Sequence, residues 1–300
     1  MTIPMATTDG PPRIRFEAGS RVGIVAGGGK LPEAVASALE AQGRRPYIIM
    51  VEGEADPAGP LAAHDHDFLA VEHFASLVPL LKRNGVTHVV LAGEVRRRPR
   101  LSKLRMNFSL LASLPRIALE LALGDDGLLR AVLRYIERRG IKVVGAHEVV
   151  PELLAVEGCL TKTLPRKPDW RDIGKARAAA EAIGALDIGQ GAVAIGGRVV
   201  ALEGIEGTNG LLERVRDLRG HGRLAGKSGG VLVKCAKPGQ ELRADLPTIG
   251  PQTVRLAHAA GLSGIGVEAG RSLVMDGPGV VADADALGLF VVGLPAKGDP

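Results

Sequence analysis

The chain has 300 residues, a length that favours two ordinary domains, and its 46% hydrophobic and 24% charged residues are typical of a globular protein with a buried core. Aromatic residues make up only 3%, which argues against a single-strand nucleic-acid platform, because such platforms stack bases on aromatic side chains. The net charge of +5 favours anionic ligands, and two cysteines without a CxxC motif indicate reduced thiols rather than a disulfide scaffold.

The start of the chain carries no targeting signal that we recognise. Residues 1–20 lack the charged start and apolar core of a signal peptide and are expected to form a flexible lead. No run approaches the roughly 20 apolar residues that a transmembrane helix needs. We therefore expect a cytoplasmic protein.

The first half alternates strands and helices, which predicts a Rossmann-like parallel sheet over residues 21–150. An apolar strand at 21–26 ends in Gly27, Gly28 and Gly29, and a helix follows at 31–42. The third glycine of a G-x-G-x-x-G fingerprint is missing. The turn suits a single phosphate or a ribose, and a plain strand-to-helix turn is the alternative.

Charged residues follow the strand expected at 88–92. Glu94 and Arg96 stand just beyond its carboxyl end, where open α/β sheets bind ligands. A basic run continues to Arg105 and could contact an anionic headgroup, a phosphate or a membrane surface; a solvated loop is the alternative. No nucleic-acid reader motif accompanies it. The apolar stretch at 110–121 could line an apolar groove, and ordinary core packing is the alternative.

A histidine- and aspartate-rich segment at 64–67 looks like a set of metal ligands, but no further cluster completes it. A solvated turn is the favoured interpretation. Residues 151–170 contain several prolines and are expected to link the two domains. Within them, Thr161 and Thr163 could offer hydroxyls to a ligand in an inter-domain cleft, or simply cap turns.

The second half, residues 171–300, is expected to form a mixed α/β domain with a hairpin at 192–203. Its hairpin ends in Glu203, and Glu206, Gly207 and Thr208 begin the next helix. Carboxylate and hydroxyl oxygens at such a junction suit magnesium. The alternative is a helix cap made by Thr208.

The stretch at 231–253 combines a strand, a turn and a helix start. The strand at 231–235 has one apolar face, and its other face carries Lys234. Lys237 and Asp245 follow before Pro251, which is well placed to open a helix. Cations and a carboxylate near a helix N-terminus indicate a phosphate and metal site. Solvated charges around a strand–turn–helix are the alternative.

These features together predict a magnesium-assisted enzyme that acts on a phosphorylated substrate. The competing hypothesis is a non-catalytic nucleotide- or anion-binding protein. Further information comes from motifs spread over residues 21–294, in this order: GIVAGGGKLP, LAGEVRRRP, GCLTKTLP, DIGQGAV, EGIEGTNGLLERV, GGVLVKCAKPGQELRADLPTIGPQTV and GIGVEAGRSLVMD. In these motifs the chain resembles the LpxI-type UDP-2,3-diacylglucosamine pyrophosphatases of lipid A biosynthesis.

The resemblance implies a reaction and its partners. Family members hydrolyse UDP-2,3-diacylglucosamine to UMP and 2,3-diacylglucosamine 1-phosphate (lipid X), require Mg²⁺ and have two α/β domains. A homodimer is implied, and the basic run would allow peripheral contact with the inner membrane. A divalent ion would neutralise pyrophosphate oxygens as water attacks phosphorus.

The resemblance also suggests roles for single residues. Asp245 would bind metal or activate water, and Lys234 and Lys237 would clamp phosphate oxygens. Glu203 and Glu206 would complete a metal site. The remaining substrate-binding residues would be Gly27, Gly28, Gly29, Glu94, Arg96, Thr161, Thr163, Asp187, Gln190, Gly207 and Thr208. One departure concerns Asn209, where the family usually has Asp; an amide there offers an oxygen without charge.

Overall fold

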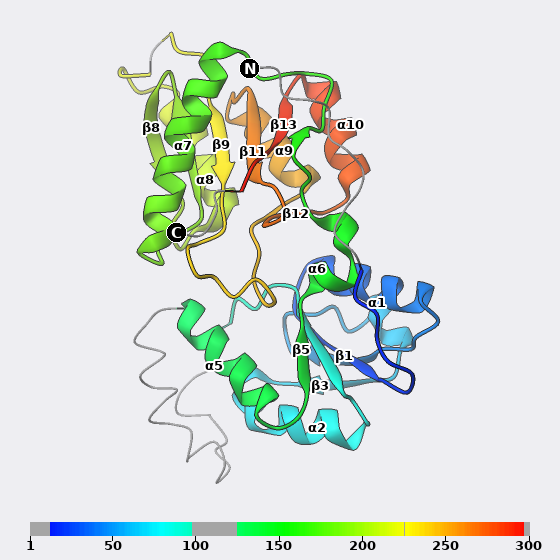
Figure 1. The fold of residues 1–300 in the computed structure, drawn as a ribbon. Helices are drawn as coiled ribbons and strands as arrows, with labels where there is room; N and C mark the ends of the chain where they lie inside the picture. The colour runs from blue at the N-terminus through cyan, green and yellow to red at the C-terminus, as the bar shows by residue number, and fades with distance from the viewer. Residues whose placement is uncertain (1–12, 98–124, 225, 297–300) are drawn as a thin grey trace. The chain divides into compact units, whose positions relative to one another are not determined.

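The computed structural model describes residues 13–97, 125–224 and 226–296, and the chain divides into two compact units (Figure 1). The N-terminal unit comprises Pro11–Pro151 and Glu241–Asp245, and the C-terminal unit comprises Glu152–Gln240 and Leu246–Pro300. Both units are α/β, as the sequence predicted. No helix within the described ranges is long and apolar enough to cross a membrane.

The N-terminal unit contains a five-stranded sheet in the order β3-β2-β1-β4-β5, with every neighbouring pair parallel. Its strands are β1 (Val22–Ala26), β2 (Tyr47–Val51), β3 (His66–Leu69), β4 (His88–Ala92) and β5 (Lys142–Val144). Its helical segments are α1 (Leu31–Ala41), η1 (Pro60–Ala63), η2 (Val71–Ser76), α2 (Leu77–Arg83), α5 (Asp125–Glu137) and α6 (Ala146–Val149). The strand order reverses between β1 and β4, so this sheet has a topological switch point at their carboxyl ends.

Packing explains why these strands form. The buried side chains on one sheet face contact those of α2 and α5 in a single cluster that includes Ile49, Val89, Leu81, Leu133 and Ile136. All five residues of β2 are buried, as expected for a parallel strand that helices cover on both faces. The helix expected at 128–139 is found as α5, which spans Asp125–Glu137 in the described residues.

The segment at 64–67 corrects an expectation. His66–Leu69 is not a turn but a strand, β3, which pairs with β2 at the edge of the sheet. The Tyr47 hydroxyl donates to the Asp67 carboxylate, and Asp65 pairs with Arg21 at 2.8 Å. Burial, followed by the contact with Asp67, raises the pKa of Tyr47. These carboxylates therefore have partners on β2 or next to β1, and β3 lacks apolar alternation because it lies at an edge.

The C-terminal unit contains a six-stranded mixed sheet in the order β6-β13-β11-β9-β7-β8. Its strands are β6 (Gly158–Cys159), β7 (Gly191–Ile195), β8 (Arg198–Leu202), β9 (Val231–Lys234), β11 (Gly264–Glu268) and β13 (Phe290–Leu294). A separate pair joins β10 (Thr248–Ile249) to β12 (Leu273–Val274). The helical segments are α7 (Lys167–Ala185), α8 (Gly207–Leu218), α9 (Pro251–Ala259) and α10 (Gly277–Leu287), with η4 (Pro151–Leu153) at the start.

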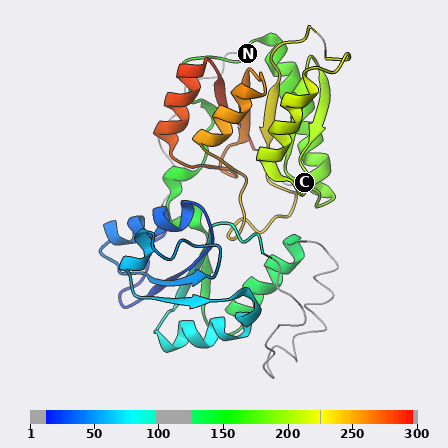
Figure 2. The ribbon, with the colours of Figure 1, turned by 180° about the vertical axis from the view of Figure 1, so that it is seen from behind.

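Helices cover both faces of this sheet, with α7 on one face and α8, α9 and α10 on the other (Figures 1 and 2). Val231 and Val233 of β9 pack in the cluster that contains Ile173 and Ala176 of α7. Leu232, between them, packs in the opposite cluster with residues of α8 and α9. The strand at 231–235 is therefore buried on both faces. The region expected to be a linker, 151–170, contains β6 and the start of α7.

Candidate active site in the C-terminal unit

The carboxyl edge of the C-terminal sheet gathers charged residues from separate parts of the chain. Glu203 follows β8, Lys234 ends β9 and Glu268 ends β11, and these three strands run in the same direction. Because β7 runs antiparallel, its first residue, Gly191, pairs in register with Lys234. Gln190, just before β7, therefore lies at the same edge.

A buried chain of hydrogen bonds connects the central residues of this edge. The Thr208 hydroxyl accepts from Lys234 Nζ at 2.6 Å and donates to Glu203 Oε1 at 2.6 Å. Lys234 Nζ lies 3.8 Å from the same Glu203 oxygen and also donates to the Thr248 carbonyl at 3.3 Å. Lys234 and Glu203 are only 4% and 5% exposed. The two charges are thus removed from water and are compensated mainly by each other through one threonine.

Two glycines make this approach of Glu203 possible. A Cβ atom at Gly189 would stand 2.2 Å from the Glu203 carbonyl oxygen, and one at Gly191 would stand 2.6 Å from Glu203 Oε2. Between them, the Gln190 N–H donates to Glu203 Oε2 at 3.4 Å. The side-chain oxygen of Gln190 is buried and has no hydrogen-bond partner in the part of the chain that the structure describes. This oxygen is a hydrogen-bond acceptor that a ligand hydroxyl or N–H group could contact.

A second ion pair lies on the turn that follows β9. Lys237 Nζ contacts Asp187 Oδ1 at 2.5 Å, with side chains 15% and 24% exposed. Asp187 has a φ of 54°, a left-handed conformation that short polar residues tolerate. The Lys237 N–H donates to Gln240 Oε1 at 2.8 Å, which closes the turn. The two lysines of the motif are therefore held on one short segment, and each lies close to a carboxylate.

Glu268 was not among the site residues that the sequence suggested. It is 5% exposed and its Oε2 accepts the Ala236 N–H at 3.0 Å, which fixes the turn between Lys234 and Lys237. The signal available in the sequence was an acidic residue at the end of an otherwise apolar strand. Such a carboxylate is costly to bury unless it accepts a hydrogen bond.

Other predicted residues lie elsewhere in the C-terminal unit. Glu206 contacts Arg214 at 2.5 Å, and Gly207, with a φ of 69°, opens α8. Asn209 is exposed in the first turn of α8. The predicted roles of these residues remain predictions.

The two threonines of the GCLTKTLP motif lie toward the opposite end of the sheet. Cys159 pairs with Val292 in an antiparallel register, which carries Thr161 toward the start of β13. The Thr161 hydroxyl accepts the Val291 N–H at 3.0 Å and donates to the Thr163 carbonyl at 3.0 Å. Thr161 is 1% exposed, so its hydroxyl serves the packing of β6 against β13.

Asp245 belongs to the N-terminal unit by its contacts, although Lys234 and Lys237 belong to the C-terminal unit. Its N–H donates to the Glu241 carbonyl at 3.2 Å, and its side chain is exposed. Among the residues that the structure describes, no group of three or more His, Cys, Asp or Glu side chains is placed to hold a metal ion. The metal set of Glu203, Glu206 and Asp245 therefore remains a prediction.

The carboxyl edge of the N-terminal sheet shows a different arrangement at its switch point. Gly28 and Glu94 exchange backbone hydrogen bonds of 2.8 and 3.0 Å, which joins the turn after β1 to the turn after β4. A Cβ atom at Gly27 would stand 2.5 Å from the Glu94 carbonyl oxygen, whereas one at Gly29 would meet open space. Glu94 and Arg96 form an exposed ion pair at 2.7 Å, which raises the pKa of Arg96. Close backbone approach thus explains Gly27 without a ligand.

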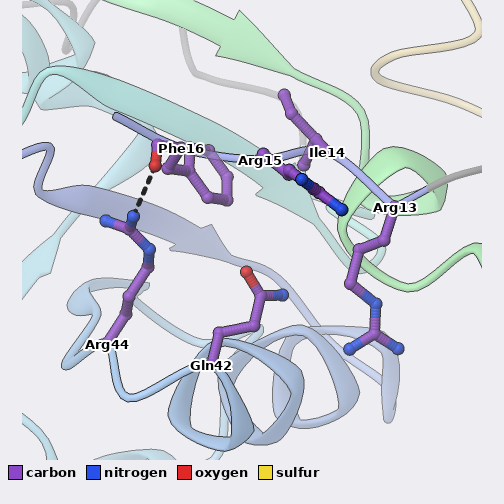
Figure 3. Close-up of a pocket in the computed structure, with 6 residues that line it drawn as sticks. All are labelled: Arg13, Ile14, Arg15, Phe16, Gln42 and Arg44. Carbon is purple, nitrogen blue, oxygen red and sulfur yellow. Dashed lines mark hydrogen bonds between the residues drawn. The ribbon is translucent and has the colours of Figure 1, made fainter. Parts of the chain in front are cut away.

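An open pocket lies between the lead segment and the end of α1, and none of the residues predicted for the site lines it (Figure 3). Arg44 donates to the carbonyls of Phe16 at 2.7 Å and Ser20 at 3.0 Å, and its guanidinium lies 5.1 Å from the centre of the Phe16 ring. These contacts attach residues 13–20 to the unit. The basic run from Arg98 to Arg105 and the apolar stretch at 110–121 lie outside the described residues.

The two sheets define a protein of two α/β domains. The C-terminal sheet carries buried paired charges at its carboxyl edge, and the N-terminal sheet carries a glycine turn at its own. Residues 21–153 match the LpxI N-terminal domain and residues 156–292 match the LpxI C-terminal domain. The chain belongs to the LpxI family, which confirms the resemblance seen in its motifs.

The chain is similar to a curated relative and, far more weakly, to two solved structures. The UDP-2,3-diacylglucosamine pyrophosphatase LpxI of Caulobacter vibrioides is 43% identical over 284 residues, covering 93% of this chain and 99% of the relative. A GalE-like L-threonine dehydrogenase from Cupriavidus necator covers 92% of this chain and 86% of its own at 10% identity, with a TM-score of 0.33. A putative NAD-dependent epimerase/dehydratase from Methylobacillus flagellatus covers 43% and 37% at 18% identity, with a TM-score of 0.24. The two structural scores are too low to bear on fold or function.

Proposed function

We propose that this protein hydrolyses the pyrophosphate bond of UDP-2,3-diacylglucosamine, giving UMP and 2,3-diacylglucosamine 1-phosphate (lipid X) in lipid A biosynthesis. The observation that carries the proposal is the 43% identity with the Caulobacter pyrophosphatase over nearly the whole of both chains. The buried Lys234–Thr208–Glu203 chain lies within the part that matches the LpxI C-terminal domain. A cytoplasmic location, peripheral contact with the inner membrane and a homodimer belong to the same proposal.

The chemistry requires charge stabilisation at two phosphorus centres. Water adds to one phosphorus, the bridging P–O bond breaks, and the leaving phosphate retains the bonding electrons. Fixed ammonium groups stabilise the negative charge that develops on the phosphoryl oxygens, and such groups act more strongly where water is excluded. Lys237 is the more accessible of the two lysines, so substrate oxygens would replace Asp187 as its partner. Lys234, buried beside Thr208, would act from a fixed position.

Magnesium is part of the proposal. Mg²⁺ sites in enzymes often use one or two carboxylates together with substrate phosphates, so a cage of three protein carboxylates is not required. Glu203 fits this role poorly because an ammonium group already lies 3.8 Å from its oxygen, and Glu206 contacts Arg214. Asp245 of the DLPTIGP motif, which the resemblance suggests for metal binding or activation of water, has an exposed side chain and is the protein ligand or water-activating group of this proposal. The bound ion would supply positive charge against the pyrophosphate oxygens.

The test is release of UMP from detergent-dispersed UDP-2,3-diacylglucosamine by the purified protein. We expect turnover with Mg²⁺, its loss on addition of a chelator and its recovery when Mg²⁺ is restored. Asp245→Asn should lose most turnover while it still binds substrate. An absence of turnover with metal and dispersed substrate would contradict the pyrophosphatase proposal. Near-normal turnover in Asp245→Asn would transfer the metal role to Glu203 or Glu206.

A non-catalytic nucleotide-binding protein is the second candidate. The observation in its favour is the turn at Gly27–Gly29, which lies at the switch point of a parallel sheet, where such sheets bind nucleotides. This candidate predicts tight binding of UMP or UDP by calorimetry together with no hydrolysis of the lipid substrate. Hydrolysis at a rate that depends on Mg²⁺ would exclude it.

A further inference from the structure

The short segment Glu241–Asp245 joins the N-terminal unit, although the residues on both sides of it belong to the C-terminal unit. It forms a compact turn in which the N–H groups of Ala244 and Asp245 both donate to the Glu241 carbonyl, at 3.0 and 3.2 Å. Ala244 packs against the core cluster of α2 and α5. The turn is therefore docked on the N-terminal unit by its own contacts.

Arg243 makes further contacts that hold this turn. Its Nη1 donates to Glu137 Oε1 at 2.6 Å, and Glu137 is the last residue of α5. Its Nε and Nη2 donate to the two oxygens of Glu241, each at 2.9 Å. These hydrogen bonds raise the pKa of Arg243, and the same contact lowers the pKa of Glu241.

The geometry of the guanidinium group explains why an arginine stands here. One edge of its planar fork closes the turn through Glu241, and the remaining nitrogen attaches the turn to α5 through Glu137. A lysine ammonium lacks this planar fork, so it could not reproduce the two-pronged contact with Glu241 while it also holds Glu137 in the same geometry. The backbone is also close, since a Cβ atom at Gly145 would stand 3.2 Å from the Arg243 Cα atom.

We propose that Arg243 is a positioning residue for the hydrolysis, which holds the turn that carries Asp245 against α5 through Glu137. The inference rests on the proposed function, because it matters for turnover only if Asp245 acts in the reaction. Asp245 follows Arg243 by two residues and shares its turn, so the attachment of Arg243 sets the place of the Asp245 backbone. Misplacement of a reacting group by about 1 Å can lower turnover about 100-fold.

The activity experiment compares Arg243→Met, Glu137→Gln and the double variant Arg243→Met with Asp245→Asn. We expect Arg243→Met to lower kcat about 10- to 100-fold with little change in KM, and Glu137→Gln to lower kcat less. In the Asp245→Asn background, Arg243→Met should have little further effect, because both changes act on the same group. Arg255→Met is the matched control, since Arg255 forms an ion pair of 3.0 Å with Asp283 in the other unit.

Hydrogen exchange provides a measurement that does not depend on turnover. The amides of Ala244 and Asp245 should exchange about 10-fold faster in Arg243→Met than in the wild type, which corresponds to about 1.4 kcal/mol less protection. If Arg243→Met does not fold, the same measurement is made on Arg243→Lys, which retains the positive charge but lacks the planar guanidinium group. It should show a smaller change in the same direction.

The outcomes separate this inference from the proposed function. A wild type without turnover would overturn the proposed function and with it the catalytic consequence of Arg243. With an active wild type, unchanged kcat in Arg243→Met would overturn the positioning role. If Arg243→Met lowered kcat by the same factor in the Asp245→Asn background as in the wild type, the positioning role would also be overturned, because Arg243 would then act on a group other than Asp245.

Discussion

The carboxyl edges of the two sheets make a useful comparison, because parallel strands end at both and yet the residues there differ in kind. At the C-terminal sheet, Lys234 and Glu203 are almost completely buried and share Thr208. At the N-terminal sheet, the ion pair of Glu94 and Arg96 is exposed, with side chains 66% and 77% accessible. The two ion pairs therefore occupy similar positions in their sheets. The pair of the C-terminal sheet is buried, whereas the pair of the N-terminal sheet is exposed to water.

The two ion pairs should differ in how much stability is lost when one partner is removed. A buried ion pair is costly to form, and it becomes strongly destabilising when one partner is removed. An exposed pair contributes about 0–1 kcal/mol and is screened by salt. We therefore expect substitutions at the C-terminal edge to change both stability and turnover, and substitutions at the N-terminal edge to act mainly through backbone packing.

The largest effect is expected for Lys234→Met. Removal of the ammonium group leaves Glu203 buried without a charge partner, so the free energy of unfolding should fall by about 3–5 kcal/mol. Loss of a fixed positive group near the reacting phosphate should lower kcat by about 100- to 1,000-fold. Urea unfolding and UMP release measure the two quantities. Lys234→Met with Glu203→Gln should recover stability without recovering turnover; recovery of both would refute the role of Lys234.

A smaller effect is expected for Thr208→Val, which keeps the shape of the side chain and removes the hydroxyl that links Lys234 to Glu203. Loss of this buried link should lower the free energy of unfolding by about 1–3 kcal/mol and also lower kcat. Thr161→Val is the matched control, because its buried hydroxyl lies toward the other end of the same sheet. It should cost similar stability with unchanged kcat. Equal losses of turnover in both variants would abolish the distinction and support a ligand role for Thr161.

At the N-terminal edge, Gly27→Ala should lower the free energy of unfolding by about 1–3 kcal/mol, because the new methyl group overlaps the Glu94 carbonyl. Gly29→Ala meets open space and should be affected only by its φ of 86°. Thermal unfolding of the two variants gives the comparison. A raised KM in Gly27→Ala with unchanged stability would instead indicate that this glycine serves the substrate.

The smallest effect concerns pH and His147 in the N-terminal unit. Burial lowers the pKa of His147 below its ordinary value of 6.5. The unfolded chain therefore binds more protons than the folded chain in the interval below about pH 6.5, and stability falls as the pH drops through it. His147→Gln should weaken the loss of stability between pH 7 and pH 5, as measured by urea unfolding. An unchanged pH dependence would contradict this assignment.

Much of the fold follows from local patterns in the sequence. The glycine turn, the hairpin and the start of α9 at Pro251 appear where periodicity and turn residues predict them. The polar edge strand β3 was missed, because a strand at an edge needs no apolar alternation. The two-residue strand β6, which carries Thr161 away from the charged edge, is too short to give any pattern.

The sequence suggested which residues belong to the candidate site, but it gave little information on how they are arranged. The ordered motifs identified Lys234, Thr208 and Glu203, and the structure brings them into contact. The burial of Lys234 was not predictable, because it depends on strand neighbours and on helices that cover both faces of β9. The attachment of the Asp245 turn was likewise hidden, since Arg243 reaches Glu137 across 106 positions of sequence.

The excursion of Glu241–Asp245 into the N-terminal unit has a consequence for how the chain can be divided. The family boundary near residue 153 suggests that the two halves could be produced as separate fragments. A fragment ending there would lack Ala244 against its core and would leave Glu137 without Arg243. The other fragment would carry that turn without the surface on which it docks. The N-terminal unit is therefore completed by residues that the linear order assigns to the second half, so a cut near residue 153 would not separate the two units intact.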